Sequence, residues 1–154
     1  MVEWWRDVPA MDSWGTARPV VYWLATGIVA AELAVGGAWD LARLSFVADV
    51  VAHLGYPGYF LVLLGCWKVA GAAALLLPRW PLVKEWAYAG AFFVYTGAIV
   101  SHLSSAYGAG EVVVLTGLAA LTVLSWALRP VSRRLRAPRR AGGAVMAPRP
   151  GSRV

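Results

Sequence analysis

The chain has 154 residues, of which 60% are hydrophobic and 14% are charged. Soluble domains average about 45–50% apolar and about 25% charged residues, so this composition excludes a disordered chain and an ordinary soluble enzyme and indicates a membrane protein. The net charge of +6 is typical of a nucleic-acid-binding protein, but eight arginines and no acidic residue lie in residues 129–154. The rest of the chain holds six basic and eight acidic residues, a formal charge of −2. We therefore expect no nucleic acid among its partners.

Four long apolar stretches predict four membrane-spanning helices. They cover residues 20–38, 59–77, 86–102 and 112–128, and each has 17–19 residues. That length is at the short end of what a transmembrane helix needs. Because a helix pairs its own backbone groups, it can lie in lipid without unsatisfied donors. The expected fold class is an all-α membrane protein, a bundle of four transmembrane helices in contact with the lipid bilayer.

The distribution of basic residues predicts the orientation. Four spans place both termini on one side, and the amino-terminal segment, the 78–85 turn and the tail together hold twelve of the 14 basic residues. The two loops on the other side hold only Arg43. By the positive-inside rule both termini are cytoplasmic, and we expect a multi-pass protein of the plasma membrane.

The regions outside the spans divide the chain further. Residues 1–19 contain Trp4, Trp5 and Trp14 and are predicted to be a Trp-rich interfacial segment. Residues 20–128 are predicted to form the membrane domain, and residues 129–154 a disordered Arg-rich tail. Between the first two spans, residues 40–54 read as a short amphipathic surface helix, ended by the 55–58 turn. Arginines directly after the last span are expected to contact anionic lipid; they are Arg133, Arg134, Arg136, Arg139 and Arg140.

Two predicted spans carry a full charge: Glu32 in the first and Lys68 in the second. An ionisable group in a span is costly and is expected to face the bundle interior or water. Three interpretations stay open. The two charges form an ion pair that fixes helix packing, they belong to a site for a polar headgroup, a quinone or a proton, or Lys68 reaches an interface without meeting Glu32.

The third span carries a polar stripe. Tyr88, Tyr95 and His102 are spaced by seven residues and so share one helix face, with Ser101 beside them. Either the tyrosines are structural, or an outward-facing polar pocket is present, whose members would be Glu32, His53, Lys68, Tyr95 and His102. Several small residues are expected to allow close helix contact; among them are Gly27, Gly65, Gly71, Gly90 and Gly97.

The numbers of cysteine and histidine residues give little support for a metal site or for redox chemistry. One cysteine and two histidines exclude a CxxC pair and the usual zinc sites. No ligand set for haem, flavin or iron–sulfur is visible, and we expect no metal. No cofactor is evident, although a quinone is a candidate ligand because its carbonyl oxygens need a donor such as His, Lys or Tyr.

Residues 53–103 resemble the DoxX-like family of small four-span membrane proteins. The likeness rests on LGYP before the second span, on LG-x-x-K-x-x-G-A at residues 64–72, and on KEWAYAG followed by GA-x-x-SH at residues 84–102. It extends over residues 20–128 and implies a four-helix bundle in the plasma membrane. The family takes its name from a small subunit of a quinol-oxidising enzyme, relatives include a receptor-assembly chaperone, and most members have no assigned activity. Structural importance is implied for the motif residues, which are Lys68, Lys84, Glu85, Tyr88, Ser101 and His102.

Three functions are compatible with these features. The first is a non-catalytic accessory or assembly subunit that works by helix contact with a membrane protein partner or with a second copy of itself. The second is a quinone- or lipid-binding redox subunit. The third is an oligomeric transporter of small solutes, which the lack of a visible repeat makes less favourable. No electron carrier of the protein's own is visible, and this favours the first.

Overall fold

The computed structural model describes residues 15, 17–78, 80–130 and 133, and this part of the chain consists of helices and connecting turns without strands. The helices are α1 (Ala17–Ala42), α2 (Ser45–His53), α3 (Tyr59–Leu76), α4 (Pro81–Ser104) and α5 (Ala109–Leu128). The expected all-α class is confirmed. Of the predicted Trp-rich segment 1–19, residues 1–14 and 16 lie outside the described residues, as does most of the Arg-rich tail. Residues 17–19, which were expected to precede the first span, belong to the start of α1.

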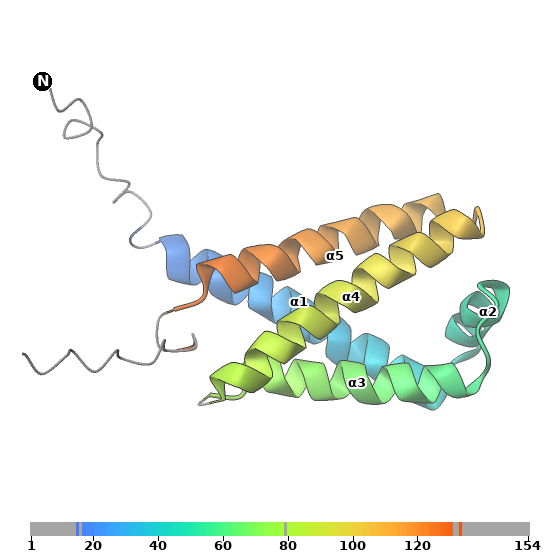
Figure 1. Cartoon of the computed structure of the whole chain (residues 1–154), viewed down its shortest axis with the longest axis horizontal. Helices are drawn as coiled ribbons and strands as arrows, with labels where there is room; N and C mark the ends of the chain where they lie inside the picture. Colours follow the sequence, from blue (N-terminus) through green and yellow to red (C-terminus); the bar gives the residue numbers. More distant parts are fainter. Residues whose placement is uncertain (1–14, 16, 79, 131–132, 134–154) are drawn as a thin grey trace, which may run out of the picture.

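Three of these helices, α1, α3 and α5, are long and apolar enough to cross a membrane. The predicted third span corresponds to α4, which has 24 residues but includes Lys84, Glu85 and His102 and is less apolar. It lies lengthwise in the same bundle (Figure 1). That α4 is a fourth span stays a prediction.

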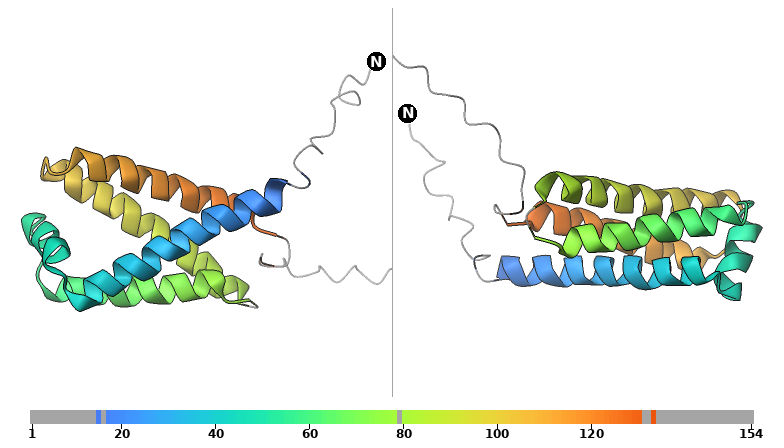
Figure 2. Two further views of the ribbon diagram at one scale, coloured as in Figure 1. Left: turned by 180° about the vertical axis from the view of Figure 1, so that it is seen from behind. Right: turned by 90° about the horizontal axis from the view of Figure 1, so that it is seen from below.

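The long helices pack as two pairs. The most extensive contacts are between α1 and α3 and between α4 and α5, while α1 also contacts α5 and α3 contacts α4. Figure 1 shows α3 and α4 close together where α3 ends and α4 begins, and spread apart toward α2. Figure 2 (left) shows α1 from behind, running diagonally across the bundle from the tail side of α5 to the α2 side of α3. We call the two ends of the bundle the α2 end and the tail end, the latter being where the described chain begins and finishes.

Two glycines bring α1 and α3 into close contact. A Cβ atom at Gly65 would lie 2.8 Å from the carbonyl oxygen of Gly37, and a Cβ at Gly37 would lie 2.9 Å from Cβ of Lys68. Neither position can therefore hold a side chain without separating the helices. Of the other glycines expected at helix contacts, Gly27, Gly90 and Gly97 have open space beside them, and Gly71 would meet only Leu33, at 3.8 Å.

The segment between α1 and α3 differs from its predicted form. Residues 40–54 were expected to be one surface helix, but α1 continues to Ala42 and only Ser45–His53 forms α2. A left-handed backbone at Arg43, with φ of 50°, separates the two helices. The 55–58 turn is confirmed as the break before α3, with φ of 84° at Gly55. The extra turn of α1 carries Asp40 into the bundle.

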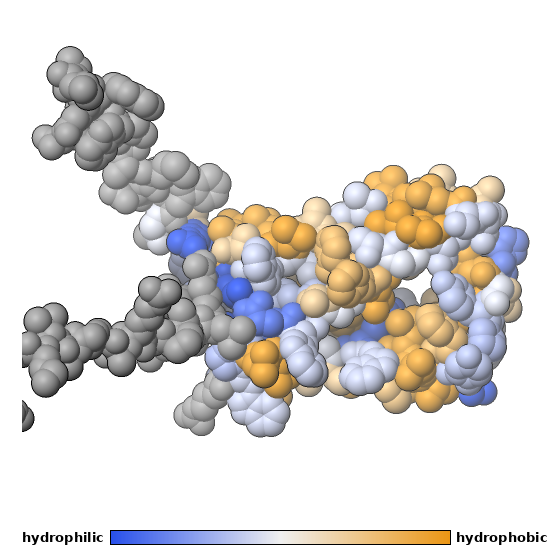
Figure 3. Space-filling view, in the orientation of Figure 1, coloured by the Kyte–Doolittle hydropathy of each residue, from blue (hydrophilic) through white to orange (hydrophobic). Residues whose placement is uncertain are grey.

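The centre of the bundle is an apolar layer contributed by four helices. It consists of Val29, Leu33, Ala72, Leu75, Tyr88, Ala91, Tyr95 and Ala119. The hydroxyls of its two tyrosines bond to Ser125 toward the tail end and to Glu32 toward the α2 end. Many large apolar side chains are instead exposed on the outside, and Figure 3 shows them covering much of one face. Such a surface suits lipid rather than water.

Candidate functional site

Three charged side chains meet between α1 and α3. Glu32 and Asp40 are eight residues apart on α1 and so lie on one face, about 12 Å apart along the axis. The Lys68 ammonium lies between them, with Nζ 3.6 Å from Oε1 of Glu32 and 3.3 Å from Oδ2 of Asp40. Gly36 is midway between the carboxylates, and a Cβ there would lie 3.1 Å from Nζ of Lys68. The glycine thus leaves the space that the ammonium group occupies.

Sequence analysis missed Asp40, because it placed that residue on a surface helix. The side chain is only 3% exposed, against 28% for Glu32. Oδ2 of Asp40 has the ion-pair contact with Lys68 but no hydrogen bond. The sequence does contain a signal for this residue. Asp40 follows Glu32 by eight residues with a glycine midway, and residues eight apart lie on the same face of a helix.

These charges line a cavity of about 440 Å³ at the α2 end. Its polar wall residues are Glu32, Asp40, Tyr56, Lys68, Tyr95, Ser101 and His102. Its apolar wall comes mainly from α2, the start of α3 and the middle of α4, with Val47, Val50, Val51, Leu54, Phe60, Leu64, Phe93 and Val94. Figure 3 shows an opening in the side of the bundle, near its α2 end, with hydrophilic atoms visible beside it. An apolar cavity with a few converging polar groups is the usual form of a small-molecule site.

Hydrogen bonds fix the orientation of two hydroxyl groups of the cavity wall. The Tyr95 hydroxyl donates to Oε2 of Glu32, which leaves Oε1 for Lys68. Ser101 Oγ donates to the Gly97 carbonyl at 2.9 Å and lies 2.7 Å from the Tyr56 hydroxyl. Because a serine has one hydroxyl hydrogen, Tyr56 is the donor of the second bond. Tyr56 therefore ties the 55–58 turn to α4.

The two histidines have different positions. His102 is buried on the cavity wall, and its Nδ1 lies 3.0 Å from the carbonyl oxygen of Tyr107. A carbonyl only accepts, so Nδ1 carries the hydrogen and Nε2 of the neutral ring is an acceptor. His53 is exposed at the end of α2, with its ring 4.3 Å from the Tyr107 ring. It does not line the cavity, so the structure brings together four of the five residues expected in one pocket.

Tyr88 belongs to a separate cluster at the tail end, although it shares a helix face with Tyr95. Its hydroxyl lies 2.9 Å from Oγ of Ser125, which lies 2.7 Å from Oγ1 of Thr26. Thr26 in turn donates to the carbonyl of Tyr22 at 2.7 Å. These three side chains are buried and link α1, α4 and α5. We call them the hydroxyl cluster.

Lys84 and Glu85 make contacts that hold the tail end together. Lys84 is buried, and its Nζ donates to the carbonyls of Ala74 and Leu75 at 2.8 and 2.7 Å. These carbonyls are unpaired within α3 because they belong to its last turn, where a positive charge is also favourable. Glu85 accepts a hydrogen bond from Arg129 at 3.0 Å and forms an ion pair with it through the other carboxylate oxygen, at 2.7 Å. Both side chains are thus explained by helix termination and helix pairing.

Of the five arginines expected to contact anionic lipid, the structure describes Arg133. Its guanidinium lies 3.4 Å from the Tyr22 hydroxyl and 3.4 Å from the carbonyl of Leu75, and 4.6 Å from the Trp23 ring centre. Arg133 therefore contacts the ends of α1 and α3. Arg134, Arg136, Arg139 and Arg140 lie outside the described residues.

The cavity offers a ligand two carboxylates, one ammonium, three hydroxyls and one imidazole acceptor. Such walls bind and orient a molecule that has both donors and acceptors. Within residues 17–78 and 80–130, no three His, Cys, Asp or Glu side chains are grouped so as to hold a metal ion.

Comparison with known proteins gives one match. The sequence profile of the DoxX-like family matches residues 24–128, which is more than half of the chain. No curated protein and no solved structure shows significant similarity to it. Together with the three long apolar helices, the match makes the chain a multi-pass membrane protein in contact with the lipid bilayer.

Proposed function

This chain belongs to the DoxX-like family, and we propose that it is a four-span protein of the plasma membrane whose cavity binds the polar head of a membrane-soluble ligand. The ligand is of the quinone or lipid type, and the protein acts as a non-catalytic subunit of a membrane complex. In this topology α4 is the third of the four spans. Its 24 residues extend about 36 Å, enough for a hydrocarbon core of about 30 Å.

The basic residues support an orientation with both termini in the cytoplasm. Arg18, Lys84, Arg129 and Arg133 all lie at the tail end, whereas Arg43 lies at the α2 end. The cavity then opens toward the outside. A test uses single cysteines in a Cys66→Ser background. Tyr56→Cys is expected to react with a membrane-impermeant maleimide in intact cells, and Trp80→Cys only after permeabilisation; the reverse pattern would invert the topology.

The observation that carries the binding proposal is that the Lys68 ion pairs face a cavity. A charge in a span is costly, and a purely structural ion pair is expected to be closed off by packed side chains. Here Lys68, Glu32 and Asp40 all line the same hollow of about 440 Å³. That volume is within the range of small-molecule sites, about 300–1,000 Å³.

The cavity chemistry suits a flat ring with oxygen substituents. Lys68 can donate to a carbonyl oxygen, and Asp40 and His102 can accept from a hydroxyl, while Phe60 and Phe93 supply apolar walls. The protein would thus hold a quinone or quinol that another subunit oxidises or reduces. The same chemistry would also hold the head of a lipid.

The test is binding of a short-chain benzoquinone to the purified full-length protein in lipid nanodiscs, with Tyr95→Phe and Tyr88→Phe as a matched pair. Both are buried tyrosines on one face of α4, but only Tyr95 lines the cavity. We expect Tyr95→Phe to weaken binding about tenfold, which corresponds to about 1.4 kcal/mol, and Tyr88→Phe to leave it unchanged.

Equal effects of the two changes would contradict a site in this cavity. A protein that binds no quinone, carries none after organic extraction, and co-purifies with one membrane partner would instead support assembly by helix contact alone.

A further inference from the structure

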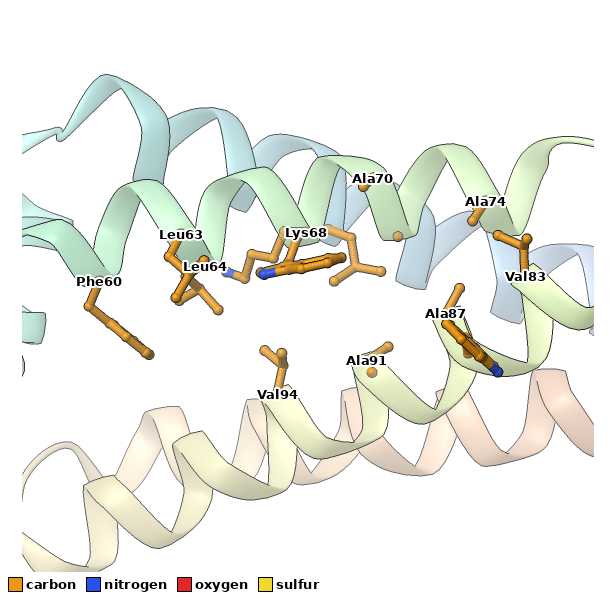
Figure 4. A pocket seen from close by; sticks show the side chains of 15 residues that line it. Phe60, Leu63, Leu64, Lys68, Ala70, Ala74, Val83, Ala87, Ala91 and Val94 are labelled. Carbon is orange, nitrogen blue, oxygen red and sulfur yellow. The ribbon is translucent and has the colours of Figure 1, made fainter.

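A second hollow, of about 350 Å³, runs between α3 and α4 on the side of the bundle. Figure 4 shows Leu63 and Leu64 of α3 facing Ala91 and Val94 of α4 across an open space, with the Lys68 side chain lying along α3 beside it. Apart from Lys68, its lining is apolar or small. We call it the lateral groove.

The lateral groove and the polar cavity share part of their walls. Phe60, Leu64, Lys68 and Val94 line both. The groove therefore leads from the side of the bundle to the ammonium group that lies between Glu32 and Asp40. A molecule with its head in the cavity would have its chain beside these shared residues.

Small residues on both facing helices leave the groove open. Gly90 has no heavy atom within 4 Å of the position of a Cβ, and Gly71 would meet only Leu33, at 3.8 Å. Both line the groove, together with Ala74, Ala87 and Ala91. These residues make space between α3 and α4 and do not serve close helix contact, in contrast to Gly37 and Gly65.

Two exposed tryptophans also line the groove. Trp67 is 68% exposed and lies in the middle of α3, whereas interfacial tryptophans lie near helix ends. Trp86 of α4 is 72% exposed. A mid-helix tryptophan beside an open groove is in position to contact a flexible apolar chain.

The charges of the cavity select the kind of head. Two carboxylates and one ammonium give a formal charge of −1, so an anionic head would be repelled. A neutral head with two oxygens can accept from Lys68 and, as a quinol, donate to Asp40, whose Oδ2 lacks a hydrogen bond.

From these observations we propose that the ligand is a long-chain quinone or quinol that enters sideways from the bilayer between α3 and α4 and keeps its chain in the lateral groove. This inference rests on the proposed function and adds the entry route and the place of the chain. Because lipid tails are as apolar as the groove, the groove gives little extra affinity. Its role is access.

The test measures the binding of two benzoquinones to the protein in nanodiscs. The two have the same head, but one carries a methyl group and the other a ten-carbon chain. Each dissociation constant is expressed per lipid. Gly90→Leu fills the groove, and Gly27→Leu is the matched control, a helix glycine with open space that lines none of the cavities. We expect Gly90→Leu to weaken binding of the long-chain quinone about tenfold, or about 1.4 kcal/mol. The methyl quinone, which can enter through the opening at the α2 end, is expected to bind as before, and Gly27→Leu to behave as the wild type.

Equal long-chain affinity in Gly90→Leu and Gly27→Leu would overturn lateral entry while leaving the cavity site intact. Displacement of the long-chain quinone by an anionic phospholipid would overturn the choice of head. Failure of the proposed function itself would give a different result: the methyl quinone would not bind at all, or would bind equally well to the wild type and to Tyr95→Phe.

Discussion

Two polar clusters lie in the same bundle, on either side of one apolar layer, and they are built differently. At the α2 end, Glu32, Asp40 and Lys68 are charged and face a cavity. At the tail end, the hydroxyl cluster is neutral, and its Thr26, Tyr88 and Ser125 side chains bond to one another without lining the polar cavity. The same face of α4 supplies Tyr95 to the first cluster and Tyr88 to the second.

The difference concerns how hydrogen-bonding capacity is used. In the hydroxyl cluster each oxygen has a protein partner, as buried polar groups require. In the charged cluster Oδ2 of Asp40 has an ion-pair contact without a hydrogen bond, and the open space beside it can hold water or a ligand. A closed cluster fixes helix packing, whereas an open one keeps capacity for a bound molecule.

Removing the cation is expected to have the largest effect. Lys68→Met leaves two carboxylates without a counter-charge, which we expect to cost about 3–5 kcal/mol. Adding Asp40→Asn should restore more stability than adding Glu32→Gln, because Asp40 is almost completely buried and Glu32 is partly exposed. Thermal unfolding in detergent measures the stability of Lys68→Met and of the two double variants. A double variant no more stable than Lys68→Met would contradict a three-charge cluster.

Separating α1 from α3 is expected to come next. Gly65→Val places a Cβ against the Gly37 carbonyl and should cost about 3 kcal/mol, at the upper end for overpacking. The control, Gly27→Val, has open space and is expected to have little effect. Thermal unfolding of both, with quinone binding as a second measurement, tests whether this contact positions the charged cluster. Equal stability of Gly65→Val and Gly27→Val would contradict a role of this contact in positioning the charged cluster.

The hydroxyl cluster is expected to matter for stability alone. Ser125→Ala removes the partner of Tyr88, while Thr26 keeps its bond to the Tyr22 carbonyl. We expect a loss of about 1.5 kcal/mol, the cost of one unsatisfied buried hydroxyl. Quinone affinity should not change. A large fall in affinity would show that the two clusters are coupled.

The smallest expected effect on stability is that of Tyr95→Phe. Glu32 loses a donor, but water in the adjoining cavity can replace it, so the cost should stay below about 1 kcal/mol. Its effect appears in ligand binding instead. Thermal unfolding is expected to show the larger loss of stability in Ser125→Ala, and quinone titration the larger loss of affinity in Tyr95→Phe. The same ranking in both assays would remove the distinction between the clusters.

The candidate site could be predicted only in part. Glu32 and Lys68 were recognisable as charges in apolar stretches, and the period of seven placed Tyr88, Tyr95 and His102 on one buried face, which the structure confirms. That period could not separate Tyr88 from Tyr95, because their partners come from different helices. Nor could it show that His53 lies outside the cavity wall, since the direction of α2 depends on the turn at Arg43.

Local sequence determined the helices of this protein, the break before α3 and its membrane character, because hydropathy and turn residues act over a few neighbours. Tertiary structure decided which small residues touch. Gly37 and Gly65 are in contact while Gly27 and Gly90 are not, since this depends on where α1 and α3 cross. It also decided that Asp40 joins Glu32 and Lys68, because α1 continues past its predicted end into the bundle. Charges far apart in the chain become one site only when helix packing brings them together.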